Sequence, residues 1–282
     1  MGLRRKTILL LLFFSIMSVG WGLECEEGEV DLGWGDCNDF PDWRCDGCMS
    51  SGCYSIDLTT QIFYNDIGIQ GIIPSEIGQL TNLTLLDLEY NQLSGEIPSE
   101  IGDLQNLVHL RLNESQLIGQ IPESIGSLTN LEYLGLYNNE LTENIPESIG
   151  SLINLNYLTL RGNNLTGEIP LEIGNLINLD VLDLFQNQFS GLIPESICNL
   201  TNLIWSSSWI DWDNHSYIFD NYLCPPYPSC IEDHVGEQDT SECDCLSGDI
   251  NEDLILDILD VVSIIEVIIE TETIGYNECG DY

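Results

Sequence analysis

Basic residues are scarce in this chain. Its 282 residues include six Lys and Arg against 47 Asp and Glu, and three of the six basic residues lie in the first 22 positions, where no acid occurs. After that segment, three Arg face all 47 acids, which gives a formal charge near −44. This charge excludes binding to nucleic acid or to an anionic membrane by electrostatic attraction. Two explanations of the acidity stay open: adaptation to a salty, divalent-rich exterior where screening weakens self-repulsion, and simple solubility of a secreted protein.

The sequence also has no apolar run of the ~20 residues that a membrane-spanning helix needs. An apolar run of about ten residues, Ile8 to Met17, follows Arg4, Arg5 and Lys6 and precedes small residues. This order predicts an export signal over residues 1–22, with an uncleaved N-terminal anchor as the alternative. We therefore expect an extracellular protein, secreted or at the cell surface, with no membrane span after signal cleavage.

Residues typical of catalytic sites are few. The only histidines are His109, His215 and His234, and the sequence lacks a nucleophile elbow, a metalloprotease motif and a phosphate-binding glycine loop. Pairs of carboxylates are common, but chance explains them when 47 acids are present. We predict that the chain is not an enzyme.

Cysteine is missing from residues 54–197 but frequent on both sides of them. All the cysteines follow the predicted signal, which favours disulfides in an oxidising compartment. Cys45, Cys48 and Cys53 could also be spaced as zinc ligands, but no His is near them. The total is odd, so at least one thiol stays unpaired or pairs with another molecule, and the connectivity is open. The disulfide candidates are Cys25, Cys37, Cys45, Cys48, Cys53, Cys198, Cys224, Cys230, Cys243, Cys245 and Cys279.

The region without cysteine contains a strict repeat. A fixed period of this size marks a solenoid built from stacked copies of one unit. In each unit a Leu-x-Leu pattern predicts a short strand, Ile-Pro predicts a change of direction, and apolar residues three apart predict a 3₁₀ or helical turn. An Asn after each strand predicts a hydrogen-bonded ladder, formed by Asn91, Asn139, Asn163 and Asn187, with Ser115 in the equivalent place. Ile-Pro recurs every 24 residues, at Ile73, Ile97, Ile121, Ile145, Ile169 and Ile193.

The full unit reads Leu-x-x-Leu-x-Leu-x-x-Asn-x-Leu-x-Gly-x-Ile-Pro, and over about residues 56–203 it resembles the 24-residue, plant-type class of the leucine-rich repeat family. The resemblance implies an α/β fold: a right-handed solenoid with a parallel sheet on its concave side. Ile67 replaces the ladder Asn of the first unit, and Glu143 replaces a recurring Gly. We expect these two departures to change the local backbone and not the fold.

Segments on both sides of the repeats are expected to close the ends of the solenoid, because an open end exposes core and strand edges. We expect a cysteine-rich N-terminal cap over residues 23–55, and an irregular last repeat with a C-terminal cap over residues 204–231. The repeat pattern resumes at Asn221-x-Leu223, after an insertion of about ten residues. That insertion holds Trp205, Trp209 and Trp212, which serve either for packing in the cap or as a ligand surface.

Residues that alternate with the buried leucines face outward on the concave sheet. Two of the three Arg beyond the signal fall there beside tyrosines, and Arg and aromatic residues dominate binding hot spots. Positive charge on so acidic a chain suggests a carboxylate-bearing protein or glycan partner. The alternative is that each Arg only balances a nearby acid, such as Asp87 or Glu114 for Arg111. The predicted ligand-binding residues are His109, Arg111, Tyr133, Tyr137, Tyr157, Arg161 and Phe185.

After an expected linker over residues 232–246, a loop carries oxygen-bearing side chains at its positions 1, 3, 5, 9 and 12, with a backbone carbonyl available at position 7. Such a set suits Ca²⁺. Residues 247–282 resemble half of a type I dockerin, which implies a small helical module and a cohesin-like receptor; a solvated acidic turn without metal is the alternative. Gly280-Asp281 repeats Gly248-Asp249, so we expect a second loop that the given sequence cuts short. The predicted calcium ligands are Asp249, Asn251, Asp253, Ile255, Asp257 and Asp260.

Together these features predict a secreted or cell-surface protein. Its repeats would recognise a protein or glycan, and its tail would tether it through calcium. Two alternatives remain: a structural or adhesive spacer without a specific ligand, and a receptor-type or inhibitor-type ectodomain.

Overall fold

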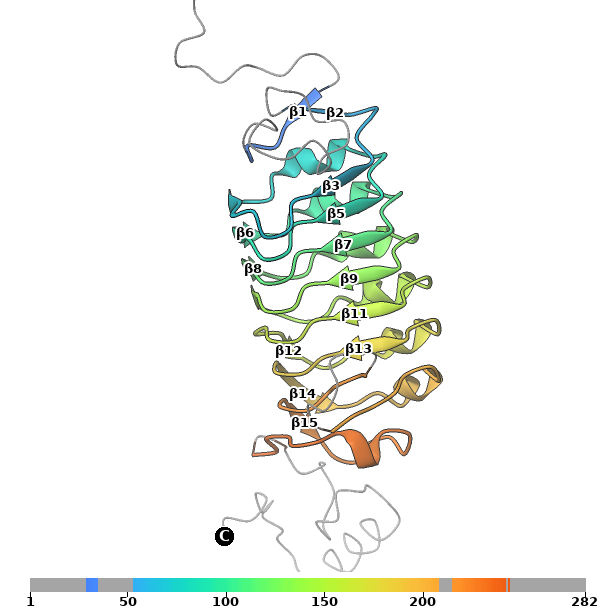
Figure 1. Cartoon of the computed structure of the whole chain (residues 1–282). Helices are drawn as coiled ribbons and strands as arrows, with labels where there is room; N and C mark the ends of the chain where they lie inside the picture. Colours follow the sequence, from blue (N-terminus) through green and yellow to red (C-terminus); the bar gives the residue numbers. More distant parts are fainter. Residues whose placement is uncertain (1–28, 35–52, 208–214, 242, 244–282) are drawn as a thin grey trace, which may run out of the picture.

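The computed structural model describes residues 29–34, 53–207, 215–241 and 243. These residues form an elongated stack of turns that runs from β1 at one end to β15 at the other (Figure 1). The predicted export signal, the predicted calcium loop, Trp209 and Trp212 lie outside the described residues. So do the cysteines Cys25, Cys37, Cys45, Cys48, Cys245 and Cys279.

A six-stranded parallel sheet forms one side of the stack. Each strand is three residues long and belongs to one 24-residue unit, and its middle residue is buried in the core. Neighbouring strands come from successive repeats, and the rest of each repeat forms the crossover between them. The 24-residue period of the sequence therefore sets the register in which these strands pair. The strands are β3 (Gln61–Phe63), β5 (Leu85–Asp87), β7 (His109–Arg111), β9 (Tyr133–Gly135), β11 (Tyr157–Thr159) and β13 (Val181–Asp183).

A row of 3₁₀ helices lies on another side of the stack (Figure 1). Each helix follows the Pro of an Ile-Pro pair and ends before a buried Leu. Proline suits this place because its φ is fixed and a helix start needs no donor from the residue before it. The helices are η2 (Ser75–Gln79), η3 (Ser99–Asp103), η4 (Glu123–Ser127), η5 (Glu147–Ser151), η6 (Leu171–Asn175) and η7 (Glu195–Asn199).

A second row of short parallel strands follows the ladder position of each repeat. The row is divided between β10 and β12, where Glu143 replaces the recurring Gly. Glu143 still adopts a left-handed φ of 64°, close to the 75° of Gly119, so the expected change is confined to the local backbone. The strands are β4 (Gln70–Gly71), β6 (Gln92–Glu96), β8 (Gln116–Gly119), β10 (Glu140–Leu141), β12 (Thr166–Gly167), β14 (Gln188–Leu192) and β15 (Tyr222–Cys224).

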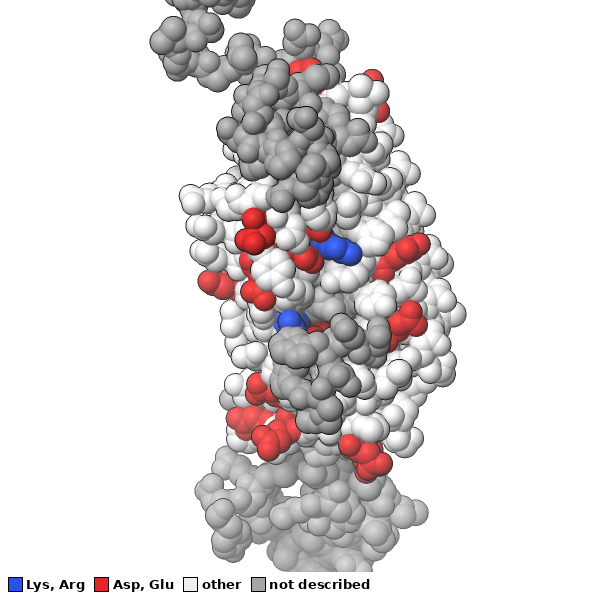
Figure 2. Space-filling view, in the orientation of Figure 1, with Lys and Arg blue, Asp and Glu red and all other residues white. Residues whose placement is uncertain are grey.

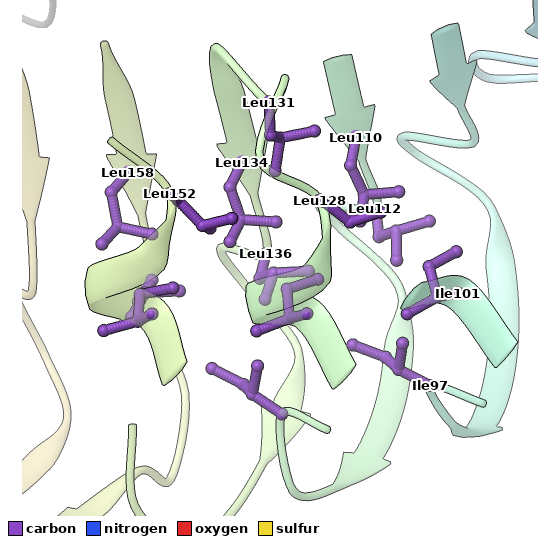
Figure 3. Packing of buried hydrophobic residues seen from close by; sticks show 14 of the residues in the cluster. Ile97, Ile101, Leu110, Leu112, Leu128, Leu131, Leu134, Leu136, Leu152 and Leu158 are labelled. Carbon is purple, nitrogen blue, oxygen red and sulfur yellow. The ribbon is translucent and has the colours of Figure 1, made fainter. Parts of the chain in front are cut away.

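Leucine and isoleucine side chains from these rows fill the interior (Figure 3). Leu110, Leu134 and Leu158 extend from the sheet, while Ile101 and Leu128 come from the helical side; all are fully buried. Each such side chain contributes on the order of 2 kcal/mol relative to exposure. A single turn has no interior of its own, so most of this stabilisation comes from stacking on its neighbours.

The predicted ladder is confirmed for its asparagines but not for Ser115, whose buried hydroxyl has no hydrogen-bond partner among the described residues. The Oδ1 of Asn139 accepts a hydrogen bond from the backbone N–H of Leu117 in the preceding turn at 3.1 Å. Its Nδ2 donates to the carbonyls of Leu112 and Leu136 at 2.9 and 3.1 Å. Asn91, Asn163, Asn187 and Asn221 make the same set of bonds. Asn221 thus rejoins the ladder after the insertion, as the sequence pattern indicated.

One glycine column allows the 3₁₀ helices to approach each other closely. A Cβ on Gly102 or Gly126 would lie 2.5 Å from a backbone oxygen of the next turn. Cys198 occupies the equivalent place in η7, the last of these helices. Its side chain forms a disulfide with Cys230. The last turn can carry a larger residue here because, within the described part of the chain, no further helix of the row stacks on it.

The segment after β15 differs from the linker expected over residues 232–246. Its described residues, 232–241 and 243, pack on the last repeat. Val235 is buried, and the backbone of Asp239 donates to the carbonyl of Asn221 at 2.8 Å. Cys243 forms a disulfide with Cys224. The short helix η8 (Glu232–His234) lies between these two cysteines in the sequence. Sequence reasoning missed this packing because the segment is polar and has no repeat phase.

At the opposite end, the first repeat is preceded by an antiparallel pair, β1 (Glu29–Asp31) and β2 (Cys53–Ser55). Val30, Trp34 and Tyr54 join the core of the array. The indole Nε1 of Trp34 donates to the carbonyl of Ile72 at 3.2 Å, which fixes this segment to the stack.

Candidate functional site

The outer face of the six-stranded sheet carries the predicted ligand-binding residues in register. His109, Tyr133 and Tyr157 occupy one column of paired residues across β7, β9 and β11. Arg111 lies in the other outward column, between Asp87 and Gly135. Arg161 follows β11 by two residues, as Tyr137 follows β9. The 24-residue phase therefore places these side chains on one face.

Aromatic rings follow one another along this face. The His109 and Tyr133 ring centroids are 6.5 Å apart, and Tyr133 stacks on Tyr157 at 5.8 Å. The hydroxyls of Tyr90 and Tyr137 lie 3.0 Å apart. Burial, followed by its interaction with Tyr90, raises the pKa of Tyr137, so this phenol is neutral at physiological pH. The result is a half-buried aromatic surface with hydroxyl groups at its edge.

Arg111 is paired with an acid, which is the alternative that the sequence left open. Its Nη1 lies 3.5 Å from Oδ2 of the fully buried Asp87, and its guanidinium lies over the Tyr133 ring at 4.8 Å from the centroid. Glu114, the other acid considered for Arg111, instead accepts a hydrogen bond from Asn138 at 2.6 Å. Removing Arg111 would leave a buried carboxylate without its cation, so this residue also supports the fold.

Arg161 has a similar environment two turns further along the stack. Its Nε lies 3.8 Å from Oδ2 of Asp183, and its guanidinium lies 4.5 Å from the centroid of Tyr137. Burial raises the pKa of Asp183 to about 7, although the charge of Arg161 and a hydrogen bond from the N–H of Phe185 act in the opposite direction. Asp183 is therefore protonated more easily than an exposed aspartate.

Glu89 lies near the other end of the same face. Burial is the main cause that raises its pKa above the usual value, and the charge of Asp87 adds to it. Hydrogen bonds donated by Asn65 and Asn113 act in the opposite direction. Arg111 and Arg161 thus each lie beside an acid. Figure 2 shows two basic patches on a face with several acidic ones.

A shallow concavity of about 690 Å³ opens on this face. It brings together four of the predicted residues, Tyr133, Tyr137, Tyr157 and Arg161. His109 and Arg111 lie beside it, in contact with Tyr133. Phe185 is not in its lining and packs on Phe219, with ring centroids 4.4 Å apart. The other lining residues are Tyr90, Glu114, Asn138, Thr159, Val181, Asp183, His215 and Tyr217.

Several of these lining residues were missed by sequence reasoning. Asp183 stands in an outward column, so the period places it on the face, but its pairing with Arg161 depends on side-chain packing. His215 and Tyr217 follow the insertion, so they do not fall 24 residues after Val181 and Asp183. Tyr217 reaches the face because it pairs with Asp183 in an isolated parallel bridge. The available signal was the spacing between Ile218 and the ladder residue Asn221. It equals the spacing between the buried residue after the strand and the ladder Asn in the other repeats.

Trp205 is partly buried against the core, in keeping with a packing role. In the described part of the chain, no group of His, Cys, Asp and Glu side chains is arranged to hold a metal ion. Within that same part, no helix has the length and apolar character to cross a membrane.

Comparisons with known proteins agree with this architecture. Residues 65–147 match the family described as a leucine-rich repeat region, and residues 154–176 and 178–200 each match the leucine-rich repeat. No curated protein matches the chain. The described array is therefore of the leucine-rich repeat class.

Receptors are among the similar solved structures. The plant peptide hormone receptor RGFR1 in complex with RGF2 is 42% identical, over 61% of this chain and 27% of that chain, with a TM-score of 0.56. The TDR receptor is 33% identical, over 62% and 29% of the two chains, with a TM-score of 0.56. The Arabidopsis receptor kinase HAESA, in complex with the peptide hormone IDA and the co-receptor SERK1, is 33% identical over 60% and 27%, with a TM-score of 0.54. The chain thus spans less than a third of the length of each of these receptor chains.

Proposed function

We propose that the chain is an extracellular binding protein whose six-stranded face recognises a segment of a protein partner. The observation that carries the proposal is the concavity on that face, with its tyrosines and Arg161. Half-buried tyrosines and arginine offer large contact areas together with polar groups, the composition typical of binding hot spots. The complexes of RGFR1 with RGF2 and of HAESA with IDA support a peptide segment as the ligand. A glycan is the other ligand that such an aromatic surface suits.

Two disulfides within the array support an oxidising, extracellular location, which agrees with the export signal predicted for residues 1–22. The proposed role is binding without catalysis. Both a secreted protein and a receptor-type ectodomain fit this role.

We further propose that residues 247–282 bind calcium through the loop from Asp249 to Asp260 and engage a cohesin-like receptor. The spacing of oxygen-bearing residues in the sequence supports this part of the proposal.

The binding role can be tested by comparing two double variants as baits in an extracellular fraction of the source organism. Tyr157→Ala with Arg161→Ala alters the concavity, and Glu147→Ala with Ile153→Ala alters exposed residues on the helical side. A partner retained by wild type and by the helical-side variant, but reduced at least tenfold with the concavity variant, is the expected result. Equal capture by all three baits would refute recognition through this face. Matching circular dichroism spectra would show that each bait is folded.

A further inference from the structure

The charge of the concavity depends on two side chains that approach each other from neighbouring strands. Arg161 follows β11 and is the only Lys or Arg among the described residues that line it. Asp183 ends β13, 3.8 Å away. The Arg161 side chain keeps 18% of its surface exposed, whereas Asp183 keeps 8%. The Arg161 side chain is therefore more accessible than the Asp183 carboxyl group.

We propose that Arg161 is a subsite for an anionic group of the ligand, and that protonation of Asp183 switches this subsite on. The inference rests on the proposed binding function and names the chemistry and the regulation of that same site. While Asp183 is ionised, it balances the charge of Arg161 and repels an incoming anion. When Asp183 takes up a proton, the concavity gains one positive charge without any movement of the backbone.

Burial makes Asp183 suitable for this role. Its carboxyl group accepts a hydrogen bond from the backbone N–H of Phe185 at 3.3 Å and faces Arg161 on the other side. Ionised carboxylates are penalised where water is excluded, and here this penalty outweighs the attraction of the arginine, so the pKa of Asp183 rises to about 7. A moderate change of pH around neutrality then changes the charge of the site.

Other titratable groups lie near Arg161 and Asp183. Their effects on anion binding must be distinguished from the effect of Asp183. Tyr157 lines the concavity, and the Tyr137 ring centroid lies 4.5 Å from the Arg161 guanidinium. Tyr217 pairs with Asp183 from the next turn. His215 lines the same concavity, and Glu114 lies on its opposite side, after β7. His215 is the histidine in the lining, so it is the group that most needs a control.

The expected effect follows from Coulomb interaction. An anion about 6 Å from Asp183, at an effective dielectric constant of about 40, gains roughly tenfold in affinity when the carboxylate loses its charge. Neutral ligands gain nothing. The pH dependence should thus separate charged from uncharged probes of the same shape.

Phenylacetate and p-cresyl sulfate are suitable probes, with phenylacetamide as the neutral control. The two anions keep their charge between about pH 5.5 and pH 8.5, so any pH dependence comes from the protein. Their rings can pack on the tyrosines, and comparing the two shows whether the subsite prefers carboxylate or sulfate. Dissociation constants of the full chain, measured by NMR titration, should fall about tenfold for at least one anion from pH 8.5 to pH 5.5. Those for phenylacetamide should stay constant.

Three single variants test whether the pH dependence of anion binding comes from Arg161 and Asp183. Asp183→Asn keeps the side-chain shape and should bind the anions at both pH values as tightly as wild type does at the acidic one. His215→Gln should keep the wild-type pH dependence, and Arg161→Gln should lose anion binding at both pH values. Thermal unfolding checks that each variant is folded.

Anion binding that is independent of pH in wild type, or a pH dependence that survives Asp183→Asn or disappears with His215→Gln, would overturn the switch. So would a failure of both anions to bind. None of these results changes the partner-capture comparison, which tests the binding function separately; partner capture that is insensitive to the concavity variant would instead overturn the function itself.

Discussion

Asp183 and Arg161 illustrate how packing changes the chemistry of common side chains in a periodic array. The sequence period places both on one face, because the outward columns follow directly from the 24-residue phase. The period does not indicate that Asp183 is buried, because burial depends on the neighbouring Tyr217 and on the turn after the insertion. Residue positions on the face were therefore predictable, whereas the electrostatic environment of this pair was not.

At the residue scale we predict that Asp183 makes stability depend on pH. Its pKa is about 7 in the folded state and near the ordinary 3.8 in the unfolded chain. Between these pH values the folded state holds a proton that the unfolded chain has released, so the free energy of unfolding falls as pH rises from about 4 to about 7. This loss should be on the order of 3 kcal/mol.

Urea denaturation of wild type and Asp183→Asn at about pH 4.5 and pH 8 measures the effect. The variant should gain relative to wild type as pH rises, because it cannot titrate at this position. Comparing the two proteins removes the contribution of the high net charge, which both share. A difference in stability that is the same at both pH values would show that Asp183 has an ordinary pKa.

At the scale of the repeat element, local structure is dictated by a few side chains. The strand, the Asn ladder and the 3₁₀ helix each appear where Leu, Asn and Ile-Pro predicted them. Two residues that depart from the repeat consensus show what the consensus residues contribute to the structure. Glu143 holds the left-handed backbone that Gly usually adopts, and Ser115 interrupts the ladder, since its buried hydroxyl oxygen has no hydrogen-bond partner among the described residues.

Ser115→Asn should repair the ladder and stabilise the array by about 1 kcal/mol, because the longer amide can bond to backbone groups of its own and the preceding turn. The reverse change in the next repeat, Asn139→Ser, is the matched control and should destabilise by about 1–3 kcal/mol because it leaves buried carbonyls without a donor. Denaturation midpoints report both effects. Two shifts of the same sign would contradict this account of the ladder.

At the scale of the whole molecule, the 24-residue period predicts a stack and a single extended face. The period does not predict where the stack ends, because the residues of the final turn follow an insertion. They no longer fall at intervals of 24 from the preceding repeats. Cys243 and Val235, expected in a linker, belong to that end. The concavity depends on the same region through His215 and Tyr217, which explains why sequence reasoning found only part of its lining.

The calcium proposal is also tested on the whole chain. Calcium that binds only the folded state should raise the free energy of unfolding of the tail, by about 2.7 kcal/mol at a calcium concentration 100 times the dissociation constant. Asp253→Ala together with Asp257→Ala should remove this response, whereas Glu147→Ala on the helical side of the array should keep it. Thermal unfolding across a calcium titration provides the measurement, and a wild-type profile insensitive to calcium would contradict a metal site.

The central claim is that the face of the six-stranded sheet is the binding surface, and hydrogen–deuterium exchange of the chain with and without its captured partner tests it most directly. The account predicts slower exchange in the partner complex at β9, β11, β13 and the turns that carry Tyr137 and Arg161, with η5 and η6 unchanged. Slower exchange confined to the 3₁₀ helices, with the strands unaffected, would contradict it.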